Sequence, residues 1–130
     1  MEQQIEYYQN KLKYEIDASD LHDALVNKKD VVPLDARHSM SYDNEHIPDA
    51  INIPHREMNL QSTKHLDKNK LYVCYCDGIG CNASTKGALN MTKLGFKVLE
   101  LIGGIAWWKL DGYATEGLKP TDGTEIQCNC

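Results

Sequence analysis

Apolar and polar residues follow two different periods along this chain. Short segments that are mostly apolar, and that are compatible with buried strands, occur at 14–16, 31–35, 50–53, 71–75 and 98–101. The segments between and after them carry apolar residues at helical spacing or are polar and helix-compatible: 19–26, 39–45, 57–66, 83–94 and 105–108. Strands that alternate with helices predict an α/β fold with a mainly parallel sheet covered on both faces.

Residues at the ends of these segments support the predicted boundaries. Ser19 and Ser39 are expected to be helix N-caps, because a hydroxyl accepts a hydrogen bond from a free backbone N–H of the first turn. Gly95 stands where a left-handed C-terminal cap is expected, and Gly112 ends the last helix. Pro33 argues mildly against a buried strand at 31–35, since proline removes one ladder donor.

The chain of 130 residues has the length of one ordinary domain with its own core. Ile5, Tyr8 and Leu12 fall at helical spacing, which predicts that residues 1–13 form a helical extension lying on the body of the domain. Residues 14–118 are expected to be the domain itself. Residues 119–130 are predicted to be a polar, mobile tail.

Charge and cysteine usage narrow the function classes. A net charge of -5 leaves no basic stripe for nucleic acid, and no apolar run is long enough to span a membrane. The first residues lack the features of a secretory signal, so a cytoplasmic protein is expected. In a reducing compartment its cysteines are predicted to be thiols rather than structural disulfides: Cys74, Cys76, Cys81, Cys128 and Cys130.

The stretch 71–85 carries the main candidate for chemistry. An apolar strand run ends at Cys76, is followed by Gly78 and Gly80, and continues as a helix. A strand, a tight loop and a helix N-terminus together present backbone N–H groups to an anion. Cys76 is therefore the predicted reacting residue, because such a setting favours its thiolate.

Five short motifs make the chain resemble a known family. They are the segments 34–37 (Leu-Asp-Ala-Arg), 46–54 (His-Ile-Pro-Asp-Ala-Ile-Asn-Ile-Pro), 75–76 (Tyr-Cys), 95–96 (Gly-Phe) and 103–108 (Gly-Gly-Ile-Ala-Trp-Trp). In this order, from about 14 to 117, they resemble a single rhodanese domain. The resemblance implies a three-layer α/β/α fold with a five-stranded, mainly parallel sheet. It also implies a sulfurtransferase whose cysteine accepts a sulfane sulfur as a persulfide.

The proposed chemistry also follows from the residues themselves. A free thiol has a pKa of about 8.5, and a helix N-terminus lowers it, so a Cys76 thiolate is expected near neutral pH. Backbone N–H groups of the loop are expected to stabilise the persulfide anion on Cys76. That loop is predicted to bind substrate: Asp77, Gly78, Ile79, Gly80, Cys81, Asn82 and Ala83. Asp35 and Arg37 are expected to brace it, and no cofactor or metal is required.

Two features depart from the usual family pattern. The segment after Cys76 is about two residues longer than the usual loop and its helix, which predicts a different pocket. Asp77 stands where a basic residue would assist an anionic donor, so weak thiosulfate activity or another sulfur donor is expected. No arginine lies between Cys76 and Ser84, which argues against phosphatase chemistry that clamps phosphoryl oxygens with a guanidinium.

The other cysteines leave alternatives open. Cys81 lies in the same loop as Cys76, as a resolving cysteine would, and either forms a disulfide with it or simply packs at the helix start. Cys74 is predicted to be a core residue. Cys128 and Cys130 lack the spacing of a zinc site and are expected to bind no metal.

Three further observations bear on function. Gly78 to Ala83 satisfies a G-x-G-x-x-A dinucleotide pattern with Glu100 downstream, but too little chain follows to complete a nucleotide-binding fold. His46 is predicted to be structural. Trp107 and Trp108 are adjacent on a helix, so one is expected in the core and the other near the surface.

The sequence thus predicts a sulfurtransferase with a small sulfane-sulfur donor and a thiol, cyanide or protein acceptor. Nucleic acid and membrane are not expected partners. Two alternatives remain: a redox or persulfide relay that uses Cys76 and Cys81, and a non-catalytic binding module.

Overall fold

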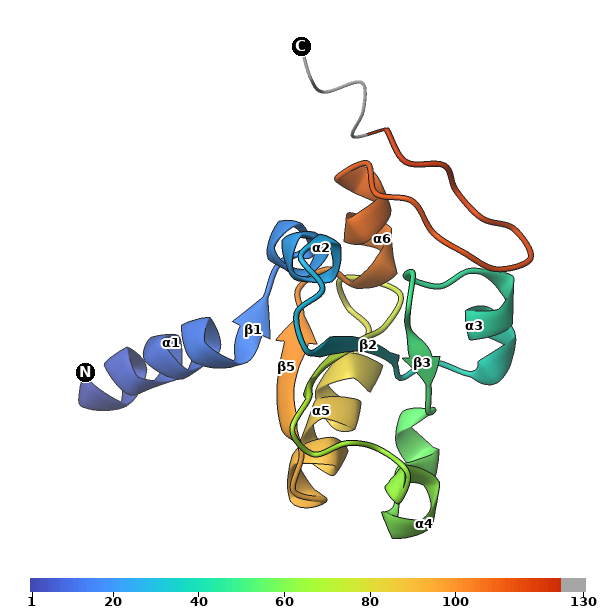
Figure 1. Ribbon diagram of the computed structural model, residues 1–130. Coiled ribbons are helices and arrows are strands. Elements are labelled where there is room, and N and C mark those ends of the chain that lie inside the picture. The colour runs from blue at the N-terminus through green and yellow to red at the C-terminus, as the bar shows by residue number, and fades with distance from the viewer. Residues whose placement is uncertain (125–130) are drawn as a thin grey trace.

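The computed structural model describes residues 1–124, and Figure 1 shows their arrangement. The helices are α1 (Glu2–Tyr14), α2 (Ala18–Val26), α3 (Ser39–Asn44), α4 (Leu60–Thr63), α5 (Ala83–Lys93) and α6 (Gly104–Leu110), with a 3-10 turn η1 (His55–Glu57). The strands are β1 (Glu15–Ile16), β2 (Val31–Asp35), β3 (Ile51–Asn52), β4 (Leu71–Tyr75) and β5 (Lys97–Leu101). The predicted alternation of strands and helices is confirmed.

The strands form one parallel sheet in the order β1-β5-β4-β2-β3. Strand β4 lies in the middle, between β5 and β2. Its register with β2 sets Leu34 beside Cys74 and Asp35 beside Tyr75. The carboxyl ends of the two strands therefore meet at one edge of the sheet, where Asp35 lies next to the strand that leads into Cys76.

Helices cover both faces of the sheet, and each face has its own core. Along β4, Val73 and Tyr75 pack with residues of α2 and α6, including Leu21 and Trp108. Tyr72 and Cys74 point to the other face and pack with Met91 of α5 among others. In Figure 1, α2 and α6 lie above the sheet and α4 and α5 below it. The expected three-layer fold and the core position of Cys74 are confirmed.

Three local expectations are decided by neighbouring residues. Asp17, not Ser19, caps α2, because its side chain accepts a hydrogen bond from Asp20 N–H at 2.8 Å. His38 precedes α3 without a side-chain cap bond, so Ser39 is its first residue and not its cap. Pro33 is tolerated within β2 because β3 pairs only with residues 34–35, which leaves β2 with one partner strand at the proline.

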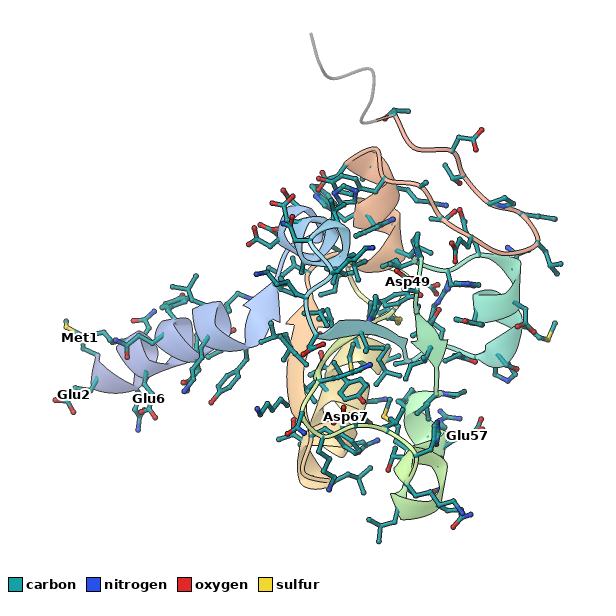
Figure 2. The ribbon with its side chains drawn as sticks, in the orientation of Figure 1. Met1, Glu2, Glu6, Asp49, Glu57 and Asp67 are labelled. Carbon is teal, nitrogen blue, oxygen red and sulfur yellow. A yellow bond between two sulfur atoms is a disulfide. The ribbon has the colours of Figure 1, made fainter. Side chains whose placement is uncertain are left out.

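Helix α1 forms as predicted but does not lie on the body of the domain. None of its residues is buried, and Ile5 and Leu12 are exposed. Figure 1 shows α1 extending away from the domain, and Figure 2 shows Met1, Glu2 and Glu6 on its outer part. The reason is geometric: the helix is a straight rod attached to the edge strand β1, so only its last turns reach β5 and α5.

The segment after α6 is attached to the domain through Glu45. The carboxylate of Glu45 accepts hydrogen bonds from the hydroxyls of Thr115 and Thr121, both at 2.6 Å, and pairs with Lys109 at 3.0 Å. Burial favours the neutral form of Glu45, but the bonds from Thr115, Thr121 and Lys109 outweigh it and lower the pKa of this carboxyl.

Two remaining expectations concern the exposure of Trp107 and Trp108 and the absence of a membrane-spanning helix. Trp108 is buried and Trp107 is half exposed, as their adjacency on one helix predicts. Among the described residues, no helix has the length and apolar character needed to cross a membrane.

Candidate active site

Cys76 directly follows the central strand β4 and begins the loop that leads into α5. Its side chain lies at the junction of sheet and helix and is only 2% exposed. The loop turns sharply at Gly80, whose φ of +92° is a conformation that favours glycine. The predicted order of strand, glycine loop and helix is therefore present, and it sets Cys76 close to the N-terminus of α5.

Helix α6 fastens the start of this loop. The N–H groups of Ile105 and Ala106 donate to the carbonyl oxygens of Cys76 and Asp77, at 3.0 Å and 2.9 Å. These are first-turn donors that a helix cannot satisfy internally. Gly104, with φ of +60°, permits the approach: a Cβ there would overlap the Cys76 carbonyl oxygen and lie 2.8 Å from Gly78 N.

Several backbone N–H groups of the loop have no hydrogen-bond acceptor within residues 1–124. Cys81 N–H donates to the Gly78 carbonyl at 3.3 Å. The N–H groups of Ile79, Gly80, Asn82 and the first helical residue, Ala83, make no hydrogen bond to the part of the chain that the structure describes. They are the donors that an anion held on Cys76 would need.

Cys76 and Cys81 are joined by a disulfide, with their Cα atoms 6.4 Å apart. Cys81 is half buried at the rim of the loop, whereas Cys76 is buried. Of the alternatives left open for Cys81, pairing with Cys76 is thus the arrangement observed. In this form Cys76 carries no free thiolate.

Arg37 links three segments around the loop. Its guanidinium is bound by Asp35 through Nη2–Oδ2 and Nε–Oδ1 contacts of 2.7 Å and 3.0 Å. It donates to the Glu45 carbonyl at 2.6 Å and, through Nη1, to Asp77 Oδ1 at 3.0 Å. Burial tends to lower the pKa of Arg37, but the adjacent Asp35 and Asp77 raise it above its ordinary value, so the guanidinium stays charged.

A cleft of about 390 Å³ opens beside the two cysteines, and it brings in residues that the sequence reasoning missed. Besides Arg37, Cys76, Asp77, Cys81 and Ala83, its lining includes Ala36, His38, Ser41, Pro54, His55, Arg56 and Glu57. Most of these residues follow β2 or β3. Because parallel strands end at the same edge of a sheet, the sequence could have indicated that residues after these strands lie near Cys76.

The two arginines that line the cleft differ in their charge partners. Arg56 forms no ion pair within residues 1–124, whereas Arg37 is neutralised by two carboxylates. Burial lowers the pKa of His55, and the nearby Lys86 and Arg56 lower it further, so its imidazole is neutral at pH 7.

A second, smaller hollow of about 150 Å³ lies against Gly78, Ile79, Gly80 and both cysteines. Glu100 on β5 lines it and accepts hydrogen bonds from the hydroxyls of Ser84 and Thr85, at 2.8 Å and 2.7 Å. Glu100 thus holds the first turn of α5, which accounts for the acidic residue that the dinucleotide pattern had drawn attention to.

His46 is not among the residues that line the cleft. His46 contacts the Tyr42 carbonyl through Nδ1 at 2.7 Å and stacks on the Tyr42 ring. Cys76, Asp77 and Cys81 have ligand atoms within 4.8 Å of one another, but the two sulfurs are bonded to each other and offer no thiolate pair to a metal. Cys128 and Cys130 lie outside the described residues.

A parallel α/β sheet with a cysteine at the carboxyl end of its central strand, in a loop that runs into a helix N-terminus, defines a class of α/β domains whose loop N–H groups can hold an anion beside a thiol. The particular family follows from direct comparison. The rhodanese-like domain matches residues 17–111, and the chain belongs to the rhodanese family.

Individual relatives agree with this assignment. The chain is 39% identical over 87 residues to the thiosulfate sulfurtransferase GlpE of Coxiella burnetii, covering 65% of this chain and 78% of that protein. The crystal structure of BH2092 from Bacillus halodurans is similar with a TM-score of 0.86 and 38% identity, over 92% of this chain and 88% of that one. The rhodanese-like domain of Alr3790 from Anabaena matches with a TM-score of 0.70 and 29% identity, over 80% and 79%.

Proposed function

We propose that the protein is a sulfurtransferase in which Cys76 is the sulfur carrier. The Cys76 thiolate attacks the outer sulfur of a sulfane-sulfur donor, and the rest of the donor leaves with the electron pair of the broken S–S bond. With thiosulfate the products are a Cys76 persulfide anion and sulfite. A thiol, cyanide or protein acceptor then takes the outer sulfur and restores the thiolate.

One observation carries this proposal: Cys76 lies at the carboxyl end of the central strand, beside a cleft and in a loop that has several N–H groups without an acceptor among residues 1–124. Those donors stabilise a negative sulfur more than a neutral thiol, and the stabilisation grows where water is excluded. The identity to a thiosulfate sulfurtransferase supports the same reaction class. Asp35 and Arg37 act by holding the loop and do not exchange sulfur.

The disulfide sets a condition on this activity. Because Cys76 is bonded to Cys81, the protein must be reduced before it can accept sulfur. Oxidised protein is expected to show no transfer, and a dithiol treatment followed by desalting is expected to restore it.

The test is mass spectrometry of the reduced, desalted protein after brief exposure to a sulfane donor. In a Cys81→Ser background, which prevents disulfide formation, a gain of one sulfur mapped to Cys76 and removed by cyanide is expected. Cys76→Ser in the same background is the matched control and should gain none. If both proteins remain unmodified with every donor, the sulfurtransferase proposal fails and the non-catalytic binding module becomes the better account.

Donor preference follows from Asp77 and Arg56. Asp77 is 71% exposed and binds the Nη1 side of Arg37, so it adds negative charge beside the reacting sulfur. We expect Asp77→Asn to raise kcat/KM for thiosulfate by about three- to tenfold, the effect of removing one screened charge near a dianion. Arg56→Gln should lower it. A kcat/KM that is unchanged in both variants would show that these charges do not select the donor.

A further inference from the structure

We propose that Cys81 is a resolving cysteine that converts the Cys76 persulfide into hydrosulfide and an internal disulfide, which makes the protein a sulfane-sulfur reductase. This inference rests on the proposed function, because it begins from the persulfide on Cys76. It adds a second outcome for the bound sulfur: release as sulfide in place of transfer to an acceptor.

The geometry of the loop supports direct attack. The two sulfurs are already within bonding distance in the disulfide, and both cysteines lie in one short loop. The turn closed by Cys81 N–H and the Gly78 carbonyl, with Gly80 in the left-handed region, brings Cys81 back toward Cys76. Two groups held this close react at a high effective concentration, so an internal attack competes well with any external acceptor.

The step balances without an added oxidant. The Cys81 thiol gives up its proton and its sulfur attacks Sγ of Cys76. The bond between Sγ of Cys76 and the outer sulfur breaks, and the outer sulfur leaves as hydrosulfide with that electron pair and the proton. The two cysteine thiols are oxidised by two electrons in total, and the sulfane sulfur is reduced to sulfide.

An external dithiol is needed to reduce the Cys76–Cys81 disulfide back to two thiols. The exposure of the two cysteines decides which sulfur this dithiol attacks. Cys76 is 2% exposed whereas Cys81 is half buried at the rim. The dithiol therefore attacks Cys81, and Cys76 leaves as a thiolate, which is the better leaving group because the loop N–H groups stabilise it. Its second thiol then frees Cys81. This order returns Cys76 in the form that accepts the next sulfur.

Cys74 lies on β4, just before the loop, and its surroundings differ from those of Cys76 and Cys81. It is fully buried on the opposite face of the sheet from Val73 and Tyr75, among Leu34, Tyr72 and Met91. Burial, with the charge of Glu100 in addition, raises the pKa of its thiol to about 12. Cys74 thus lacks both the access and the thiolate that resolution needs, and it serves as the control position.

The experiment is a single turnover without any external thiol. Fully reduced, desalted protein is mixed with one equivalent of methanethiosulfonate anion, whose leaving group is a sulfinate and which supplies no sulfide itself. For the wild type we expect one equivalent of sulfide and an intact mass lower by two hydrogens, with peptide mapping to a Cys76–Cys81 link. Cys74→Ala should behave in the same way.

The results of this experiment separate the resolving role of Cys81 from the proposed function of Cys76. Cys81→Ser and Cys81→Ala are expected to release no sulfide and to retain one added sulfur on Cys76. If the wild type also keeps the added sulfur and releases none, the resolving role is wrong while the sulfurtransferase proposal stands. If no variant, including Cys81→Ser, gains sulfur, the proposed function itself fails. A disulfide that forms without an equivalent of sulfide also overturns the resolving role.

Discussion

Asp35 and Asp77, which both bind Arg37, allow a test of which ion pair stabilises the residues around the cleft. Asp35 and Asp77 both bind the same guanidinium, which is 9% exposed, but the side chain of Asp35 is 0% exposed and that of Asp77 is 71% exposed. The change is Asp35→Asn, with Asp77→Asn as its matched control. Both replacements keep the shape of the side chain and remove one negative charge.

The expected costs differ by several-fold. Asp35→Asn leaves a buried guanidinium without its main counter-charge, and breaking a buried pair costs about 3 to 5 kcal/mol of unfolding free energy. The remaining amide oxygen still accepts from the Arg37 backbone N–H, as Asp35 Oδ1 does at 2.9 Å, which places the result toward the lower figure. Asp77→Asn breaks a solvent-exposed pair and costs about 0 to 1 kcal/mol.

Urea unfolding of the reduced proteins, followed by circular dichroism, measures both free energies. The m-values should match the wild type, so that the shift in midpoint reports stability alone. A double variant Asp35→Leu/Arg37→Met removes both charges and should recover part of the loss. If Asp35→Asn and Asp77→Asn cost the same within 1 kcal/mol, burial of the Asp35–Arg37 pair is not what stabilises this corner of the domain.

Three further predictions follow from local geometry. Gly104→Ala should lower the free energy of unfolding by clearly more than the roughly 1 to 2 kcal/mol that a left-handed alanine costs, because the new Cβ would overlap the loop backbone. Gly80→Ala is the control, since a Cβ at position 80 would have nothing within 4 Å. Equal urea midpoints for the two variants would refute the close-packing argument. Because the folded pKa of Cys74 is raised, its neutral thiol stabilises the fold below the unfolded pKa and this is lost as pH rises toward 12. Relative to Cys74→Ala, wild type should lose about 1.5 kcal/mol of unfolding free energy between pH 8.5 and 10, and parallel curves would contradict the shift. Deleting residues 1–13, none of which is buried and only the last turns of which reach the domain, should cost no more than about 1 kcal/mol and leave persulfide formation intact, and a chain that no longer unfolds cooperatively would show that the extension is part of the domain.

Local signals in the sequence were sufficient for most elements and for naming Cys76 as the candidate reacting residue. The apolar run that becomes β4, the glycines after it and the helical spacing from Ala83 all act over a few neighbouring residues. Cys81 as partner of Cys76 was also within reach, because both lie in one loop. Alternation of strands and helices was enough to predict the parallel sheet.

Tertiary structure alone decided how distant segments meet. The Arg37–Asp77 contact joins residues 40 apart in sequence, the N–H groups of α6 fasten the loop, and Arg56 reaches the cleft from η1. Helix α1 shows the opposite case, since its helical spacing was correct but its expected packing was not. Short-range periodicity reports which side of an element is apolar, whereas the identity of its partner depends on the sum of contacts across the whole fold. That is why the sequence by itself determined the elements and the place of Cys76 in a loop between a strand and a helix, and only the folded chain determined the cleft around it.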